Sequence, residues 1–178
     1  VMNLGILMVQ GRVNSFGPVV MAAFSTGVKI DAFAYMPLQD YGNAFSTFTA
    51  HNYGAGKKER IKKGMRVAFI TSLLFSIIIS VVVFILSPSL MTIFVGVEEL
   101  EIINVGTGYL RVEGAFYALI GFLFLFYGLY RGVGKPGMSF ILTIISLGSR
   151  VLLSYTISEI TYIGVYGIWW SVPIGWLL

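Results

Sequence analysis

Four polar side chains recur at helical spacing in the segment before a basic loop. Asp40, Asn43, Thr47 and His51 are separated by three, four and four residues, which places them on one face of an α-helix. A carboxylate on that face could bind a proton, Na⁺ or an organic cation. Asn43 and Thr47 have a plainer explanation as well, because small polar residues often hydrogen-bond neighbouring helices in membranes. Asp40 is therefore our first candidate for a cation site.

Two further charged residues stand in otherwise apolar stretches, Glu113 and Arg150. Counted from the adjoining basic loops, Asp40, Arg150 and Glu113 lie about 18, 21 and 27 Å along their helices. Arg150 could neutralise either carboxylate, as a structural ion pair or as one that opens when a cation arrives. Lys29 and Asp31 are expected near the opposite interface, where long side chains reach water and the role is structural.

The composition indicates a protein that lies in lipid. The 178 residues are 57% hydrophobic and 11% charged, whereas soluble domains carry about 25% charged residues. Lipid can cover this apolar surface, so we predict an integral membrane protein. The chain has no cysteine and one histidine, which excludes thiolate chemistry and disfavours a metal site. We expect no cofactor beyond a coupling ion, and no enzyme, because no nucleophile or acid–base pair is apparent.

A basic segment, His51–Arg66, orients the chain. It holds six of the twelve Lys and Arg residues, opposed by Glu59 alone. Such a loop between apolar runs is typical of the cytoplasmic side of a membrane. Nucleic acid is an unsuitable partner, because these residues form one loop without interleaved aromatic residues.

The apolar runs predict an all-α, polytopic bundle with short loops. Two long runs are interrupted or closed by proline: Pro37 is the expected bend in the first, and Pro88 ends the second. An amphipathic turn over 89–103 should lie in the interface. The predicted helices, of which the first and last are incomplete, cover residues 1–10, 19–52, 67–87, 104–130, 137–158 and 163–178. Alternation places loops 53–66 and 131–136 inside and 11–18, 88–103 and 159–162 outside, and the inside loops carry eight basic residues against one outside.

The chain resembles the multidrug and toxic compound extrusion (MATE) transporters over nearly its whole length. The resemblance is carried by Met36-Pro37, Ala44, Ser46, Asn52, Gly54-Ala55-Gly56 and Lys58-Glu59-Arg60, and further on by Tyr109-Leu110-Arg111, Arg131-Gly132-Val133-Gly134-Lys135 and Arg150. One departure is His51, where the family pattern usually has Gln. Gly128-x-x-x-Gly132 is in addition a close-packing motif for helices.

The resemblance implies one six-helix lobe of a two-lobe transporter, by preference the C-terminal one. Its partners would then be the other lobe, a small organic substrate and the lipid of the cell membrane. The implied function is H⁺- or Na⁺-coupled export of organic, often cationic, compounds by alternating access. Two alternatives stay open: a lipid-linked oligosaccharide flippase of the same superfamily, which should need a more basic cavity, and a membrane assembly subunit that transports nothing.

Overall fold

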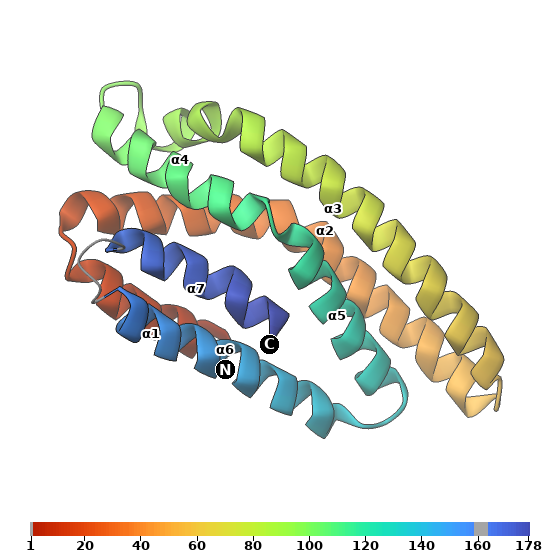
Figure 1. The fold of residues 1–178 in the computed structure, drawn as a ribbon. Coiled ribbons are helices and arrows are strands. Elements are labelled where there is room, and N and C mark those ends of the chain that lie inside the picture. Colours follow the sequence, from red (N-terminus) through yellow and green to blue (C-terminus); the bar gives the residue numbers. More distant parts are fainter. Residues whose placement is uncertain (1, 159–163) are drawn as a thin grey trace.

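The computed structural model describes residues 2–158 and 164–178, and these form helices joined by short loops (Figure 1). The helices are α1 (Met2–Asn14), α2 (Pro18–Gly54), α3 (Lys58–Val95), α4 (Leu100–Gly114), α5 (Tyr117–Gly132), α6 (Pro136–Ile157) and α7 (Val165–Leu177). The prediction of an all-α bundle is confirmed for the described residues. Residues 159–163 lie outside them, so the predicted loop at 159–162 and the start of the last helix are not described.

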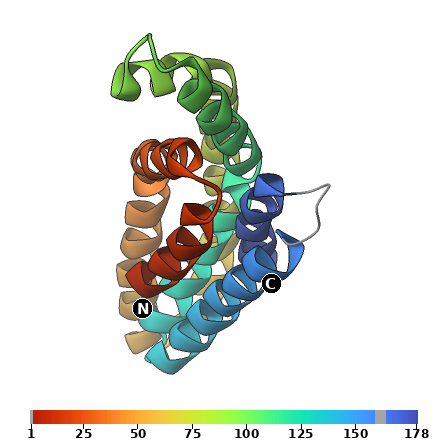
Figure 2. The same ribbon diagram turned by 90° about the vertical axis from the view of Figure 1, so that its left-hand side faces the viewer.

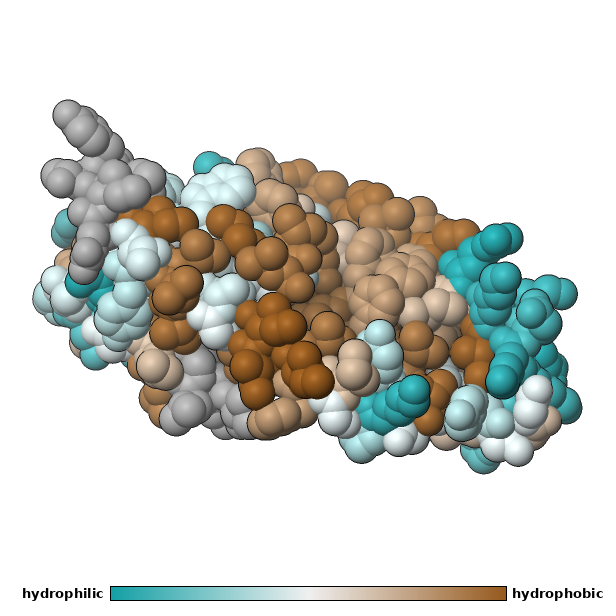
Figure 3. All heavy atoms as spheres, turned by 60° about the horizontal axis from the view of Figure 1, so that its bottom comes forward, coloured by the Kyte–Doolittle hydropathy of each residue, from teal (hydrophilic) through white to brown (hydrophobic). Residues whose placement is uncertain are grey.

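The loops gather at the two ends of an elongated bundle. Figures 1 and 2 show the α2–α3 and α5–α6 connections at one end, and the α1–α2 and α3–α4 connections at the other. This is the alternation that the sequence predicts, with the basic residues of both inside loops at the same end. Figure 3 shows hydrophilic side chains at both ends, most strongly at the basic end, and hydrophobic side chains over much of the surface between them.

The bundle contains helices fit to cross a membrane. α2, α3 and α6 are each long and apolar enough, and α4 with α5 qualifies as one broken span. Large hydrophobic side chains are exposed along α3, including Ile70, Leu74, Ile78 and Ile85. The chain is a membrane protein whose apolar outer surface requires lipid.

The long helix α3 corrects two predicted boundaries, because it begins at Lys58 and continues through Pro88 to Val95. The helix therefore starts inside the basic segment and not after it, because the charged side chains of its first turns reach water. Pro88 cannot donate to the carbonyl of Phe84, but the Ser87 hydroxyl donates to that carbonyl at 3.1 Å. The predicted interfacial turn over 89–103 is accordingly wrong, since its first part continues α3 and its last part begins α4.

The single helix predicted over 104–130 is two helices, α4 and α5, that meet at an angle of 53°. α4 ends at Gly114, and α5 begins at Tyr117. The Ser76 hydroxyl on α3 donates to the carbonyl of Tyr117 at 3.4 Å, which supplies a partner at the break. The sequence gives no sign of the bend, because residues 104–130 form one apolar run without a proline. Pro37, by contrast, lies inside α2, and Figure 1 shows that helix changing direction near its middle.

Glycines allow α2 and α5 to touch along their backbones. A Cβ atom on Gly128 would overlap the carbonyl oxygen of Gly42, and one on Gly132 would lie 2.7 Å from the carbonyl oxygen of Ser46. A Cβ on Gly42 would in turn lie 2.7 Å from the carbonyl oxygen of Phe124. The predicted close-packing role of Gly128-x-x-x-Gly132 is confirmed, and this contact fixes α2 against the half-span that carries Tyr117.

Candidate functional site

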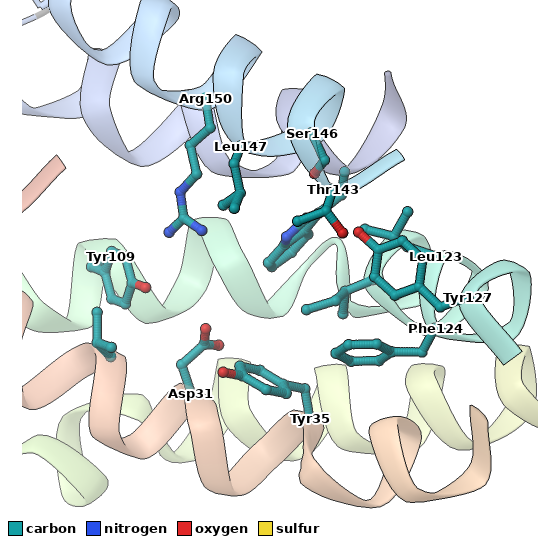
Figure 4. Close-up of a pocket in the computed structure, with 13 residues that line it drawn as sticks. Asp31, Tyr35, Tyr109, Leu123, Phe124, Tyr127, Thr143, Ser146, Leu147 and Arg150 are labelled. Carbon is teal, nitrogen blue, oxygen red and sulfur yellow. The ribbon is translucent and has the colours of Figure 1, made fainter. Parts of the chain in front are cut away.

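A cavity of ≈ 50 Å³ with charged and polar side chains in a largely apolar wall lies between α2, α5 and α6, with one residue each from α4 and α7 in its wall. This volume is enough for a few water molecules. Figure 4 shows an aspartate and a tyrosine of α2 on one side and an arginine of α6 on the other. The lining residues are Val28, Asp31, Tyr35, Tyr109, Ile120, Leu123, Phe124, Tyr127, Thr143, Ser146, Leu147, Arg150 and Trp176.

Asp31 is held in this cavity by a tyrosine from the broken span. Its side chain is 5% exposed, and its Oδ1 accepts a hydrogen bond of 2.5 Å from the Tyr117 hydroxyl. Tyr117 is fully buried and is the first residue of α5. The break between α4 and α5 therefore determines where the phenol lies. Burying a carboxylate is costly unless donors or opposite charges compensate it, and Tyr117 supplies one such donor.

Glu113 is buried without a partner. Its side chain is 0% exposed, and within the described part of the chain neither of its carboxylate oxygens has a hydrogen-bond partner. It lies in the last turn of α4, four residues before Tyr117. A buried carboxyl group with no hydrogen-bond donor among the described residues is costly, and such a group in a membrane-spanning segment is by default a candidate for a functional site.

Arg150 completes the group from the opposite side. Its guanidinium points across the cavity towards Asp31 and Tyr109 (Figure 4), and its Nε is buried without a hydrogen-bond partner among the residues described. Arg150 acts electrostatically on both Asp31 and Glu113. With all three groups ionised, the cluster of Asp31, Glu113 and Arg150, here called the buried charge cluster, has one negative charge in excess. One proton or one monovalent cation would neutralise it.

The polar stripe on α2 lies elsewhere. Asp40, Asn43 and Thr47 are exposed on the surface of the lobe, and they do not line the cavity that Arg150 enters. Asn43 accepts a hydrogen bond of 2.8 Å from Arg131 at the basic end. The structure thus separates Asp40 on the surface from Arg150 in the cavity, although the sequence places both at similar depth. Glu113, the other suggested carboxylate, is buried inside the lobe.

Sequence reasoning missed two members of the site. Asp31 was expected at the interface, but it is buried, and Tyr117 was not considered. The expectation that the Asp31 side chain reaches water was wrong, because it lies on the inward face of α2; its depth in the membrane stays a prediction. The sequence held a signal in the spacing of Lys29 and Asp31: residues two apart point to different sides of a helix, so the two side chains would not both face water.

Comparison with known proteins supplies the family. A sequence model of the MatE family matches residues 1–156. The chain belongs to the MatE family. It is 24% identical over 170 residues to "Probable multidrug resistance protein NorM" of Thermotoga maritima, a match that covers 95% of this chain and 36% of the relative. "Probable multidrug resistance protein YoeA" of Bacillus subtilis is 22% identical, with 96% and 37% covered.

Solved structures show the same fold. A MATE transporter in a bent conformation superimposes with a TM-score of 0.90 at 20% identity, over 99% of this chain and 39% of that one. A MOP superfamily transporter from Pyrococcus furiosus superimposes with a TM-score of 0.84 at 21% identity, over 99% and 38%. The chain thus spans well under half the length of these MatE proteins, as the prediction of one lobe implies.

Proposed function

We propose that this chain is one lobe of a cation-coupled exporter of organic, often cationic, compounds in the cell membrane. The observation that carries the proposal is the buried charge cluster, in which the buried Glu113 has no hydrogen-bond partner among the described residues; with all three groups ionised, one negative charge would be in excess. The relatives named as multidrug resistance proteins support the exported class of compound. The second lobe of the same transporter would close the substrate cavity, and the preference for the C-terminal position stays a prediction.

The buried charge cluster is suited to the coupling ion rather than to a drug. A cavity of ≈ 50 Å³ admits a proton, a Na⁺ ion or water, whereas sites for drug-sized molecules are about 300–1,000 Å³. Binding one cation removes the excess charge and releases Arg150 from competing carboxylates. Because Glu113 and Tyr117 lie on either side of the α4–α5 break, a change of charge there acts on the geometry of a broken span.

The exposed stripe on α2 is suited to the substrate. Asp40, Asn43 and Thr47 are polar and exposed on a helix that crosses the membrane. Such residues rarely face lipid and usually face a water-filled cavity or another helix. In the proposed transporter this face lines the path between the lobes, where Asp40 attracts a cationic substrate. Ion and substrate would then bind at neighbouring but separate groups of α2.

The sign of the charge separates this proposal from the flippase alternative. The P. furiosus neighbour is described as having a binding pocket of reverse polarity that suggests a different function. Here the only basic side chain among the residues that line the cavity, Arg150, is balanced by Asp31, and Glu113 adds a second buried carboxyl group behind the cavity wall, which suits cations. An anionic lipid-linked sugar would require the opposite sign.

The test is transport by the full-length protein in proteoliposomes. A fluorescent organic cation is offered under an imposed H⁺ gradient and then under a Na⁺ gradient, with a membrane-potential clamp in both cases. We expect uptake driven by one ion, which names the coupling ion. Uptake that follows neither gradient, together with flipping of a lipid-linked sugar in the same vesicles, would overturn the proposal.

A further inference from the structure

The first turns of α3 carry a groove whose walls are basic. It has a volume of ≈ 550 Å³ and is lined by Glu59, Lys62, Lys63, Arg66 and Val67. Three positive charges face one negative charge, so the groove has two positive charges in excess. The other basic residues of this segment, Lys57, Lys58 and Arg60, do not line it.

An apolar track leads from this groove along the same helix. The track consists of five exposed residues at spacings of one, three, four and three: Arg66, Val67, Ile70, Leu74 and Ile77. They therefore form one outward stripe. From Val67 to Ile77 the stripe is about 15 Å long, which is half of the roughly 30 Å hydrocarbon layer and thus the depth of one leaflet.

We propose that this stripe is a binding site for one anionic phospholipid of the leaflet at the basic end. Lys62, Lys63 and Arg66 bind the phosphate, and an acyl chain lies along Val67, Ile70, Leu74 and Ile77. Glu59 at the same groove accepts hydrogen bonds from hydroxyl groups of the headgroup, so phosphatidylglycerol is the fitting probe. Clusters of Lys and Arg at the membrane surface attract anionic lipids, and the groove with its apolar track turns that attraction into a specific site.

Any basic segment at the membrane surface attracts anionic lipid without a specific site. The control variant must therefore lose the same number of positive charges as the site variant. The site variant is Lys62→Gln/Lys63→Gln/Arg66→Gln. The matched variant is Lys57→Gln/Lys58→Gln/Arg60→Gln, which removes three charges from the same segment but none from the groove. All six side chains are exposed, and unchanged thermal unfolding in phosphatidylcholine establishes that both variants are folded.

The experiment counts phosphatidylglycerol molecules retained by the full-length transporter in native mass spectrometry after detergent washing. We expect the unmodified protein and the matched variant to retain one lipid molecule. In the site variant, the fraction of protein with a bound lipid should be at least tenfold lower. Equal loss in both variants, or loss in neither, would overturn the proposal, and so would a groove occupied by the other lobe in place of lipid. Glycerophosphoglycerol, which lacks acyl chains, should compete weakly; if it competed as well as the lipid, the apolar track would have no role and the proposal would fail.

Discussion

The Tyr117 hydroxyl donates a hydrogen bond of 2.5 Å to Asp31 from a residue 86 positions away in the chain. Asp31 lies on the 37-residue helix α2, and Tyr117 is the first residue after the break in the α4–α5 span. The bond therefore joins the continuous helix α2 to a span that is broken into two helices. Asp31 and Arg150 line the same cavity, and the buried Glu113 lies four residues before Tyr117 on the other side of the break.

Loss of the Tyr117 hydroxyl should destabilise the lobe. In Tyr117→Phe the buried Asp31 carboxyl loses its donor, which costs about 1–3 kcal/mol and is measured as a lower unfolding temperature of the full-length protein. In Tyr117→Phe/Asp31→Asn the two effects should be strongly non-additive, because the residues share one interaction. Tyr53→Phe, at an exposed tyrosine of the same chain, is the control. Additive effects would show that the bond contributes nothing.

Neutralising Glu113 should uncouple transport. Glu113→Gln keeps the size of the side chain but removes the negative charge in excess, so we expect at least a tenfold lower rate of ion-driven uptake in proteoliposomes. Glu101→Gln, at an exposed position in the first turn of the same helix, should transport like the unmodified protein. Normal ion-driven rates in Glu113→Gln would remove Glu113 from the coupling mechanism.

The charges of Arg150 and Glu113 should compensate each other. Arg150→Gln leaves the buried carboxyl groups of Asp31 and Glu113 without the cation of the cluster, and removing one partner of a buried charge pair costs roughly 3–5 kcal/mol. Arg150→Gln/Glu113→Gln restores the charge balance and should recover part of the lost unfolding temperature. A double variant that is less stable than Arg150→Gln would contradict the electrostatic relationship.

Asp40 should affect substrate without affecting the coupling ion. Asp40→Asn removes the exposed charge of the α2 stripe, and we expect a higher KM for the organic cation with an unchanged dependence on the H⁺ or Na⁺ gradient. His51→Gln, which lies further along α2 and is also exposed, serves as the comparison. If Asp40→Asn changed neither efflux nor its ion dependence, Asp40 would have no part in the pathway.

Gly128 should be intolerant of a methyl group. In Gly128→Ala the new Cβ overlaps the carbonyl oxygen of Gly42, and relieving that overlap requires α2 and α5 to separate, at a cost of about 1–3 kcal/mol. Gly137→Ala, at a position with open space around it, should be neutral. Equal unfolding temperatures for the two variants would show that the close contact is dispensable.

The sequence determined the class of protein and predicted which loops lie at the same end of the bundle. Composition required lipid, and the clustering of Lys and Arg between residues 51 and 66 oriented the loops, because these properties depend on residue type and order alone. The family followed from motifs that lie in loops and helix ends, such as Gly54-Ala55-Gly56. The importance of Glu113 and Arg150 was also visible, since a charge in an apolar helix is costly wherever it lies.

The tertiary structure decided which charges meet. Helical periodicity gives the face of one helix but not its rotation against its neighbours, so it could not tell that Asp31 faces inward while Asp40 faces outward on the same α2. The break before Tyr117 has no proline and arises where α4 and α5 pack against α2 and α3. Because the cluster of Asp31, Glu113, Tyr117 and Arg150 is assembled from four helices, it exists only once those helices have packed.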